Sequence, residues 1–496
     1  MMDSQMSSDQ TTLSEKLQLL QELSYSDLDM PYKGSGVHSN REIRESRTTS
    51  DIHILDVIAI CLTTGEPGDV VAVAFDREQR LSLVLAKNGS PTLEDELATQ
   101  NLISAITDPE VAYAMDIFHT LLSRCRVNME KRMSNLHQSI SLFVVDLDSA
   151  LQEYVPKSIE DEFPDSTRFR RENYGDIAPP FRTMLQDLVR MIGDSSAVPL
   201  VPDDVELSRS RFGDLYVVAI ALLRSRFLGH LCADKNLLNA AQRGRGEKLK
   251  RRLAKVCQYY GGVTKLIRNA KRYFPDGHIP YRWINNRFIG SGEGQFELCN
   301  DYLDAVQRAF GYPLSPQTVN ALEQRFPDML SNWARRRTVN TCVHAELRII
   351  LHLSSASSHP RRTVGPPEQE AIGCSKRSCF CCALWIDAYN DEFKTEWLTS
   401  GSHGKPYATW ALPGPSYAHA RIRSGKNVVD AAVLDGVSVR LTDTLAWLFP
   451  GQKRVSDEHV STGESSDSEG SVEAVIDEIY SYKEFRLRGI RGGSRR

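Results

Sequence analysis

Hydrophobic and polar positions between residues 51 and 91 predict the first ordered elements of the chain. The apolar run D-I-H-I-L-D-V-I-A-I-C-L (51–62) is too short for its periodicity to distinguish a strand from a buried helix. Two β-rich runs follow at 70–75 and 81–86, joined by a short polar link, and they predict a β-hairpin. The turn-forming residues K-N-G-S-P at 87–91 end this hairpin.

From residue 92 to residue 337 the apolar spacing is mainly helical, and Pro and Gly separate the helical stretches. The expected helices are 102–126, 128–152, 180–193, 213–233, 248–260, 262–273, 296–310 and 316–336. The pattern then changes over 338–450. It predicts a buried helix at 343–353, a short strand at 371–374, a second helix through 383–389 and candidate strands at 395–399 and 407–412.

Both ends of the chain have a composition typical of disorder. Residues 1–50 are rich in Ser, Asp, Glu and Gln, and their amphipathic segment at 13–23 is expected to form only a transient surface helix. Residues 451–496 are acidic first and basic afterwards. We therefore expect disordered tails at 1–50 and 451–496 around a helix plus hairpin (51–91), a helical region (92–337) and a motif domain (338–450).

Composition and charge exclude few classes of protein. The chain has 496 residues, with 41% hydrophobic and 25% charged residues, which is ordinary for a globular protein. A net charge of −4 attracts neither nucleic acid nor a membrane in bulk. The N-terminus lacks a hydrophobic signal core, and the longest apolar run (215–223) is too short to span a bilayer. The cysteines form no regular framework, so we expect reduced thiols and a cytoplasmic or nuclear protein, neither secreted nor bound to a membrane.

Residues 243–274 combine many Lys and Arg with aromatic residues, and they form a candidate nucleic-acid partner site. Basic side chains can track phosphates, and aromatic rings can stack on bases. However, Leu249, Leu253 and Val256 give this stretch an ordinary buried stripe, which favours a solvated helix face as the alternative.

The candidate chemistry lies in the motif domain, as H-x-E at His344 and Glu346 and as C-x-x-C at Cys379 and Cys382. One imidazole and two thiolates leave the fourth tetrahedral position of a zinc ion open, as a catalytic site requires. A carboxylate two residues after the imidazole can handle protons without being a ligand. With Ser378 as the expected N-cap, both cysteines share one face of a first helical turn. Two helix N-termini would then face each other across one metal ion.

The joint pattern resembles the cytidine-deaminase-like zinc deaminase superfamily, and more narrowly a fungal deaminase-like family. The matching runs are V-H-A-E-L (343–347), I-G-x-S-K-x-x-C-x-x-C (372–382) and G-S-H-G-K (401–405). The resemblance extends over about 338–415, and it departs from the superfamily at Ser378, where Pro is usual. It implies an α/β fold in which a mixed sheet is flanked by helices, with a large helical insertion or extension.

The same resemblance implies that His344, Cys379 and Cys382 bind Zn²⁺ and that Glu346 shuttles protons. The expected function is hydrolytic deamination of a nucleobase in a nucleoside, a nucleotide or a nucleic acid, with the oligomeric state left open. The alternatives are a catalytically silent zinc-binding scaffold and a nucleic-acid-binding interaction protein with structural zinc. A fourth protein ligand would favour a structural site, and the candidates for it are His352, Cys374 and Cys381.

The superfamily places a helix and two strands before the H-x-E helix, and the convincing hairpin upstream is the one at 70–86. We therefore expect 51–62 to be a helix, the hairpin to pack beside 371–374, and 92–330 to be an insertion. Asn88 then falls where related deaminases bind substrate, although it also suits a turn. His403 and Trp410 are further substrate-binding candidates, with a Gly-rich turn and a core aromatic residue as the respective alternatives.

Overall fold

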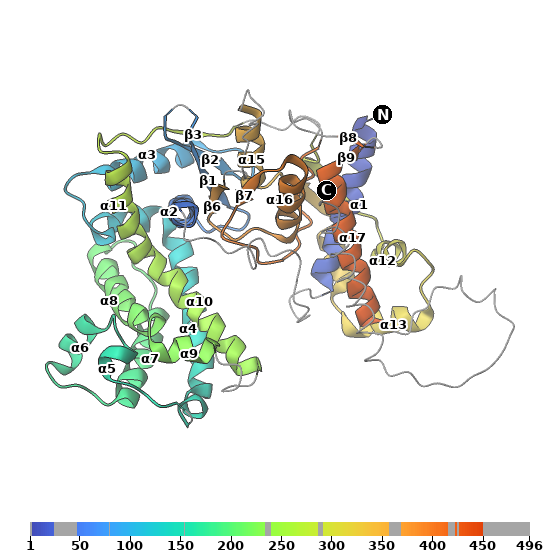
Figure 1. The fold of residues 1–496 in the computed structure, drawn as a ribbon. Coiled ribbons are helices and arrows are strands. Elements are labelled where there is room, and N and C mark those ends of the chain that lie inside the picture. Colours follow the sequence, from blue (N-terminus) through green and yellow to red (C-terminus); the bar gives the residue numbers. More distant parts are fainter. Residues whose placement is uncertain are drawn as a thin grey trace, which may run out of the picture. The chain divides into compact units, whose positions relative to one another are not determined.

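A five-stranded mixed sheet lies beside the residues of the sequence motif. The computed structural model describes residues 2–23, 47–78, 80–152, 154–233, 240–285, 291–356, 369–414, 422–423 and 426–449. The strand order is β3-β2-β1-β6-β7. These strands are β1 (Val71–Asp76), β2 (Ser82–Lys87), β3 (Tyr281–Trp283), β6 (Gln369–Cys374) and β7 (Glu396–Leu398). β1 is antiparallel to β2 and β6, whereas β2–β3 and β6–β7 are parallel pairs. The predicted α/β class, a mixed sheet flanked by helices, is confirmed (Figure 1).

Alternating residues of the sheet enter two different cores. On β1, Val71, Val73 and Phe75 join a cluster with α2 (Arg47–Leu62), while Ala72 and Ala74 join the cluster of the motif helices. This period of two is the expected geometry of a strand that is buried on both faces. The apolar run at 51–62 is thus part of a helix, α2, and it is buried against the sheet.

Helix α2 crosses β6 in close contact. A Cβ atom added to Gly373 would lie 2.0 Å from the backbone carbon of Leu55, so only glycine permits this approach. The register places Val73 opposite Gly373 in the antiparallel pair β1–β6. The hairpin, α2 and β6 therefore form one packed unit, although β6 is far away in the sequence.

The region after the hairpin is mostly helical and has a hydrophobic core of its own. Its elements are α3 (Leu93–Thr107), the 3-10 turn η1 (Ala114–Ile117), α4 (Phe118–Gln152), α5 (Ile159–Glu162), α6 (Thr167–Tyr174), α7 (Phe181–Ala197), α8 (Val205–Leu223), α9 (Arg226–Ala233), α10 (Ala240–Cys257), the π-helical segment η2 (Gln258–Gly262) and α11 (Val263–Tyr273). The predicted helix at 102–126 is wrong, because α3 ends before Pro109 and a continuous α4 begins at Phe118.

The prediction of a helical region up to residue 337 missed two strands. β3 adds to the central sheet, and β4 (Gly294–Glu297) pairs with β5 (Thr338–Thr341). Both missed strands are short and only partly buried, so they carry no clear alternation of apolar residues. The remaining helices of this region are α12 (Tyr302–Phe310), α13 (Pro316–Arg325) and α14 (Met329–Arg335).

The motif domain contains α15 (Ala345–Ala356), α16 (Phe380–Phe393) and α17 (Val428–Leu448), with a small ladder of β8 (Ile422–Arg423) and β9 (Lys426–Asn427) before α17. Instead of the predicted strand at 407–412, this segment makes an isolated bridge between Cys342 and Trp410. The predicted tail at 451–496 lies outside the described residues.

The prediction of disorder over residues 1–50 is wrong for the first part of this segment. Residues Met2–Glu22 form helix α1, which packs on α17, α12 and α14 (Figure 1). Leu13, Leu17 and Leu20 are fully buried in the core that also holds the motif cysteines. The polar composition of α1 is misleading, because its polar side chains form hydrogen bonds with residues that are far away in the sequence.

No helix in the described part of the chain is by itself long and apolar enough to cross a membrane. α8 and α9 reach the required length and composition together, but they are bent by 52° relative to each other.

Candidate metal centre

Three donor atoms converge where α15 and α16 begin. The sulfurs of Cys379 and Cys382 lie 3.6 Å and 3.3 Å from Nδ1 of His344, and the three atoms all lie within 4.8 Å of one another. All three residues are buried. A nitrogen and a sulfur that share one tetrahedral zinc ion lie about 3.6 Å apart, from the usual bond lengths. The group therefore has the spacing of ligands to a single metal ion.

Each donor sits at a helix N-terminus, as the spacing of the motif predicts. The carbonyl of His344 accepts hydrogen bonds from the backbone N–H groups of Leu347 and Arg348 and so begins α15. Cys379 is the N-cap of α16, and its sulfur accepts a hydrogen bond from the backbone N–H of Cys382 at 3.4 Å. The positive ends of both helices favour a thiolate at this point.

The predicted N-cap, Ser378, is wrong by one residue. Its backbone is instead paired with the G-S-H-G-K segment, because its N–H donates to the carbonyl of Gly401 and its own carbonyl accepts from the N–H of His403. The cap position thus belongs to the candidate donor Cys379, and the backbone of Ser378 connects the cysteine loop to the segment that follows α16.

The charges and hydrogen bonds around the three donors favour ionisation of one thiol, that of Cys379. Burial opposes ionisation of Cys379, but the hydrogen bond with Cys382 and the charge of His344 lower its pKa to about 6. Burial lowers the pKa of His344, but the charge and hydrogen bond of Cys379 outweigh this and raise it. Burial and the hydrogen bond with Cys379 raise the pKa of Cys382 well above its usual range. A metal ion would displace this last proton, as metal binding to thiols does.

Glu346 lies in the first turn of α15 and is 3% exposed. Its charge contributes to raising the pKa of His344, Cys379 and Cys382, so the carboxylate is close to all three donors. Among the described His, Cys, Asp and Glu residues, the metal-ligand group contains only His344, Cys379 and Cys382.

The three candidates for a fourth ligand lie outside the donor group in the described structure. Cys374 is buried in β6, and its backbone N–H donates to Asp56. Cys381 is fully buried in the hydrophobic core. His352 accepts a hydrogen bond from Arg282 through Nε2 at 3.3 Å. None of them joins the donor group.

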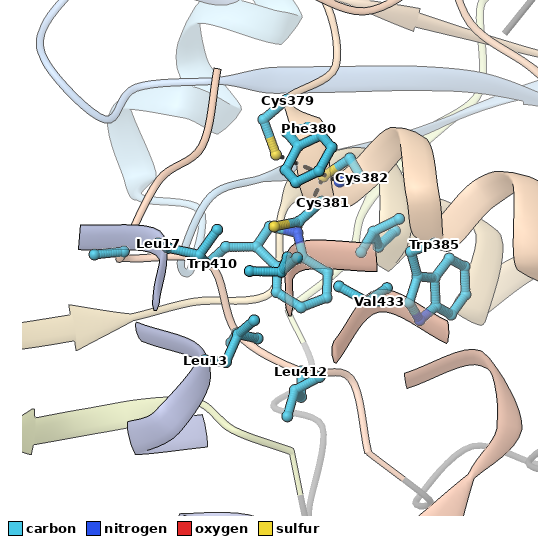
Figure 2. Packing of buried hydrophobic residues seen from close by; sticks show 14 of the residues in the cluster. Leu13, Leu17, Cys379, Phe380, Cys381, Cys382, Trp385, Trp410, Leu412 and Val433 are labelled. Carbon is cyan, nitrogen blue, oxygen red and sulfur yellow. Dashed lines mark hydrogen bonds between the residues drawn. The ribbon is translucent and has the colours of Figure 1, made fainter. Parts of the chain in front are cut away.

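The prediction that Trp410 stacks on a substrate is wrong. Its side chain is fully buried, and its indole N–H donates to the sulfur of Cys382 at 3.2 Å (Figure 2). A ring that no solvent reaches cannot receive a base. A donor to a ligating sulfur instead orients that sulfur and stabilises its negative charge.

Asn88 and His403 lie beside the donor group. Asn88 precedes the three donor residues in the sequence, and His403 follows them. Asn88 follows β2, and its side-chain oxygen accepts the backbone N–H of Ala345 at 2.9 Å. The ring of Tyr407 lies 6.4 Å from the ring of His344 and 5.8 Å from that of His403. Loss of hydration and the nearby positive charges, that of Lys405 first, lower the pKa of His403 to about 4, so it is neutral at neutral pH.

No sequence pattern reveals the residues that hold the backbone before His344. Glu293 accepts the backbone N–H of Val343 at 2.9 Å, and Arg348 donates to the carbonyl of the same residue at 3.0 Å. Glu293 and Arg348 also form an ion pair with each other. A single Glu in a glycine-rich stretch has no pattern that could reveal such a role.

Comparison with known proteins points to the same part of the chain. Residues 343–414 match the family model described as an OTT_1508-like deaminase. No curated protein and no solved structure gives a significant match to the chain. The matched stretch contains Glu346 and all three donors, and so residues 343–414 are a deaminase-like domain whose His344–Cys379–Cys382 group can hold a metal ion.

Proposed function

We propose that the protein is a zinc-dependent hydrolytic deaminase that removes an exocyclic amino group from a nucleobase, as the free nucleoside, a nucleotide or part of a nucleic acid. One observation carries the proposal: three convergent donors and a buried carboxylate stand together inside the stretch that matches a deaminase family. The sequence runs at 343–347, 372–382 and 401–405 support the narrower assignment to the fungal deaminase-like family.

The donor set fits zinc. Two thiolates and one imidazole are ligands that zinc prefers, and His344, Cys379 and Cys382 would hold the ion. When bound at such a site, zinc acts as a Lewis acid and brings the pKa of a water molecule towards neutrality. The three-membered donor group among the described residues supports a catalytic rather than a structural site, because a structural zinc ion usually has four protein ligands.

Glu346 would hold and move the protons of the reaction. Its place two residues after His344, at the start of α15, keeps the carboxylate next to the donors but outside the donor group. From there it can take one proton of the attacking water and deliver it to the ring nitrogen, and then take the second proton from the same oxygen and deliver it to the amino group, which leaves as ammonia. Burial shields this exchange from bulk solvent.

Asn88 and His403 would line the substrate pocket. Asn88 is half-buried at the start of α15, where its amide nitrogen can donate to a polar edge of the substrate. The neutral ring of His403 and the ring of Tyr407 offer a hydrogen-bonding group and an aromatic face near His344.

We also propose that residues 51–91 belong to the deaminase domain and that the helical region is inserted within it. The pairing of β1 with β6 and the close contact of α2 with Gly373 support this boundary. So long an insertion is tolerated because the entropy of loop closure grows only logarithmically with length, and the insert has its own core.

The test is the variant Glu346→Gln, assayed for ammonia release on a panel of bases, nucleosides, nucleotides and oligonucleotides. We expect zinc content and thermal stability close to wild type and loss of turnover by about 10²-fold or more, the usual contribution of general acid–base catalysis. Glu94→Gln on α3 makes the same chemical change at an exposed site and should leave turnover intact. Normal turnover by Glu346→Gln would refute the mechanism. A wild-type protein that is inactive on the whole panel would favour the silent zinc scaffold.

A further inference from the structure

Basic side chains from three separate segments are exposed around the metal centre. Helix α10 exposes Arg251 and Lys255, the loop before Cys379 exposes Lys376 and Arg377, and the segment after α16 exposes Lys405. We call these five residues the basic face.

Backbone contacts place two of these segments at the metal centre. Lys405 lies against the first turn of α16, because its carbonyl accepts the backbone N–H of Phe380 at 3.0 Å. Lys376 and Arg377 directly precede Ser378, whose carbonyl accepts the N–H of His403 at 3.0 Å. Both segments therefore border the site from the same end of α16.

Helix α10 contributes the third segment, and the charges of this segment act on the same site. Arg132 of α4 donates to the carbonyl of Lys255 at 2.9 Å and fixes that turn of α10. Loss of hydration, followed by the charges of Arg132, Arg252, Arg377 and Arg251, lowers the pKa of Lys255 to about 8. The charges of Lys405, Lys255 and Arg377 in turn contribute to the lowered pKa of His403. The segments thus lie close enough to repel one another.

Acidic residues do not neutralise the basic face. Within the described residues, none of its five members forms an ion pair, whereas Arg245 on the same helix is paired with Asp146. Asp56 and Asp69 lie nearby but are buried, and Asp69 is occupied by Thr64 and Lys87. Like charges gathered without counter-charges destabilise the free protein, so their clustering indicates an anionic ligand.

The aromatic residues of α10 and η2 do not offer a stacking platform. Tyr259 is buried beneath Arg132, at 4.9 Å from the guanidinium carbon to the ring centre. Tyr260 stacks on Tyr216, with the ring centres 4.0 Å apart. Of the sequence-predicted nucleic-acid patch at 243–274, the basic residues nearest to the metal centre are the part suited to a ligand, and they suit phosphates rather than bases.

We propose that the basic face binds the phosphates of the substrate and so delivers a nucleobase to the metal centre. This inference rests on the proposed deaminase function. Phosphate is the shared chemistry of a free nucleotide and of a nucleic-acid strand. Cations from three segments exceed what one phosphate can contact, and so we favour a single strand that crosses from α10 to the N-terminus of α16.

The test is fluorescence anisotropy with a labelled single-stranded oligonucleotide, as RNA and as DNA, titrated with the zinc-loaded full chain. The double variant Arg251→Glu, Lys255→Glu should bind roughly tenfold or more weakly, and its dependence of log affinity on log salt should be shallower by about 1.4, for two lost phosphate contacts. Arg171→Glu on α6 is the matched control, because it reverses an exposed charge in the same helical region. Equal affinities of the double variant and wild type would overturn the proposal, as would an equal loss in Arg171→Glu.

Two further measurements are needed. One distinguishes a free nucleotide from a nucleic-acid strand as the source of the phosphate, and the other tests the phosphate site separately from the deaminase function. Competition by a nucleoside monophosphate at concentrations comparable with the oligonucleotide would assign the basic face to free nucleotides, and weak competition would assign it to a strand. Circular dichroism and zinc content of the double variant must match wild type, so that lost binding reports the charges. Because binding is measured without turnover, retained binding by an inactive chain would refute the deaminase proposal and leave the phosphate site standing.

Discussion

The deaminase-like stretch 343–414 and helix α1 occupy one hydrophobic core, yet their sequences reveal them very unequally. Figure 2 shows Leu13 and Leu17 of α1 in the same buried cluster as Trp410, Cys381 and Cys382. The motif stretch is recognisable because metal chemistry accepts few residue types at fixed spacings. Helix α1 performs a generic task, covering a core, and many sequences can do that.

The polar residues of α1 explain why its composition resembles that of a disordered tail. Its side chains bind the backbone of the segment at 406–412, which is almost the whole chain away. Gln10 donates to the carbonyl of Trp410 at 2.9 Å and accepts the N–H of Leu412 at 2.8 Å. Ser14 donates to the carbonyl of Ala408 at 3.0 Å. These long-range hydrogen bonds hold α1 on the core, although its composition is that of an exposed segment. No local pattern in the sequence can reveal them.

The largest effect should come from removing α1. Deleting residues 1–23 removes several leucines that are at most 1% exposed and uncovers the core that they pack against, and each buried leucine stabilises a fold by about 1.5–3 kcal/mol. Their sum approaches the whole stability of a typical domain, about 5–15 kcal/mol. We expect an insoluble or unfolded chain by circular dichroism and gel filtration. Truncation after Phe449, which removes the other predicted tail, is the control and should leave the melting temperature within a few degrees. A deletion variant with the melting temperature of the wild type would contradict the prediction that the fold depends on α1.

The next largest effect should come from replacing the cysteine donors of the metal centre. Cys379→Ser and Cys382→Ser should each lose the bound zinc, because each removes a donor from the three-membered group. Cys381→Ser is the matched control, since its buried thiol lies between them in sequence but outside the group. Metal analysis after gel filtration measures the outcome. Zinc retained by both ligand variants would remove these cysteines from the site, and zinc retained by Cys382→Ser alone would point to Cys381.

Much of the site and part of the fold followed from the sequence, and the errors have physical causes. The helix starts at His344 and Cys379 were predictable because one metal must be reached from both. Ser378 was chosen as a cap because serine is a common one, whereas a sulfur takes this place here. For Trp410 the sequence allows either a substrate-binding ring or a core aromatic residue, and it cannot reveal the donor role to Cys382, because that role depends on a fold that the spacing does not encode.

A smaller effect depends on pH and concerns the seam between α16 and α17. Asp430 is buried and accepts hydrogen bonds from Trp385 at 3.1 Å and Gly414 at 2.8 Å, yet burial raises its pKa to about 7. Its folded pKa exceeds its unfolded pKa, so its stabilising contribution is complete at low pH and is lost as the pH rises to about 7. From pH 4 to 7 the wild type should lose about 3 kcal/mol relative to Asp430→Asn, at about 1.36 kcal/mol per pKa unit. Denaturant unfolding at both pH values measures this difference, and a constant difference would contradict it.

The last effect is the most local one, and it joins the two regions directly through Gln10 and Trp410. Replacing Gln10 by Ala leaves the buried carbonyl of Trp410 and the N–H of Leu412 without this partner, at a cost of about 1–3 kcal/mol for each such group. The indole of Trp410 would then be held less firmly against the sulfur of Cys382. Gln21→Ala is the matched control, because Gln21 donates from the same helix to the carbonyl of Pro406 and not to Trp410 or Leu412.

Chelator competition separates a local from a general effect of Gln10. If α1 supports the metal centre through Trp410, then Gln10→Ala and Trp410→Phe should both weaken zinc binding, by up to the 10–100-fold typical of groups that orient a ligand. The double variant should then lose little more than Trp410→Phe alone, because both changes act on the same hydrogen bond to Cys382. Additive losses, or an equal loss in Gln21→Ala, would mean that α1 stabilises the fold as a whole and has no specific connection to the metal site.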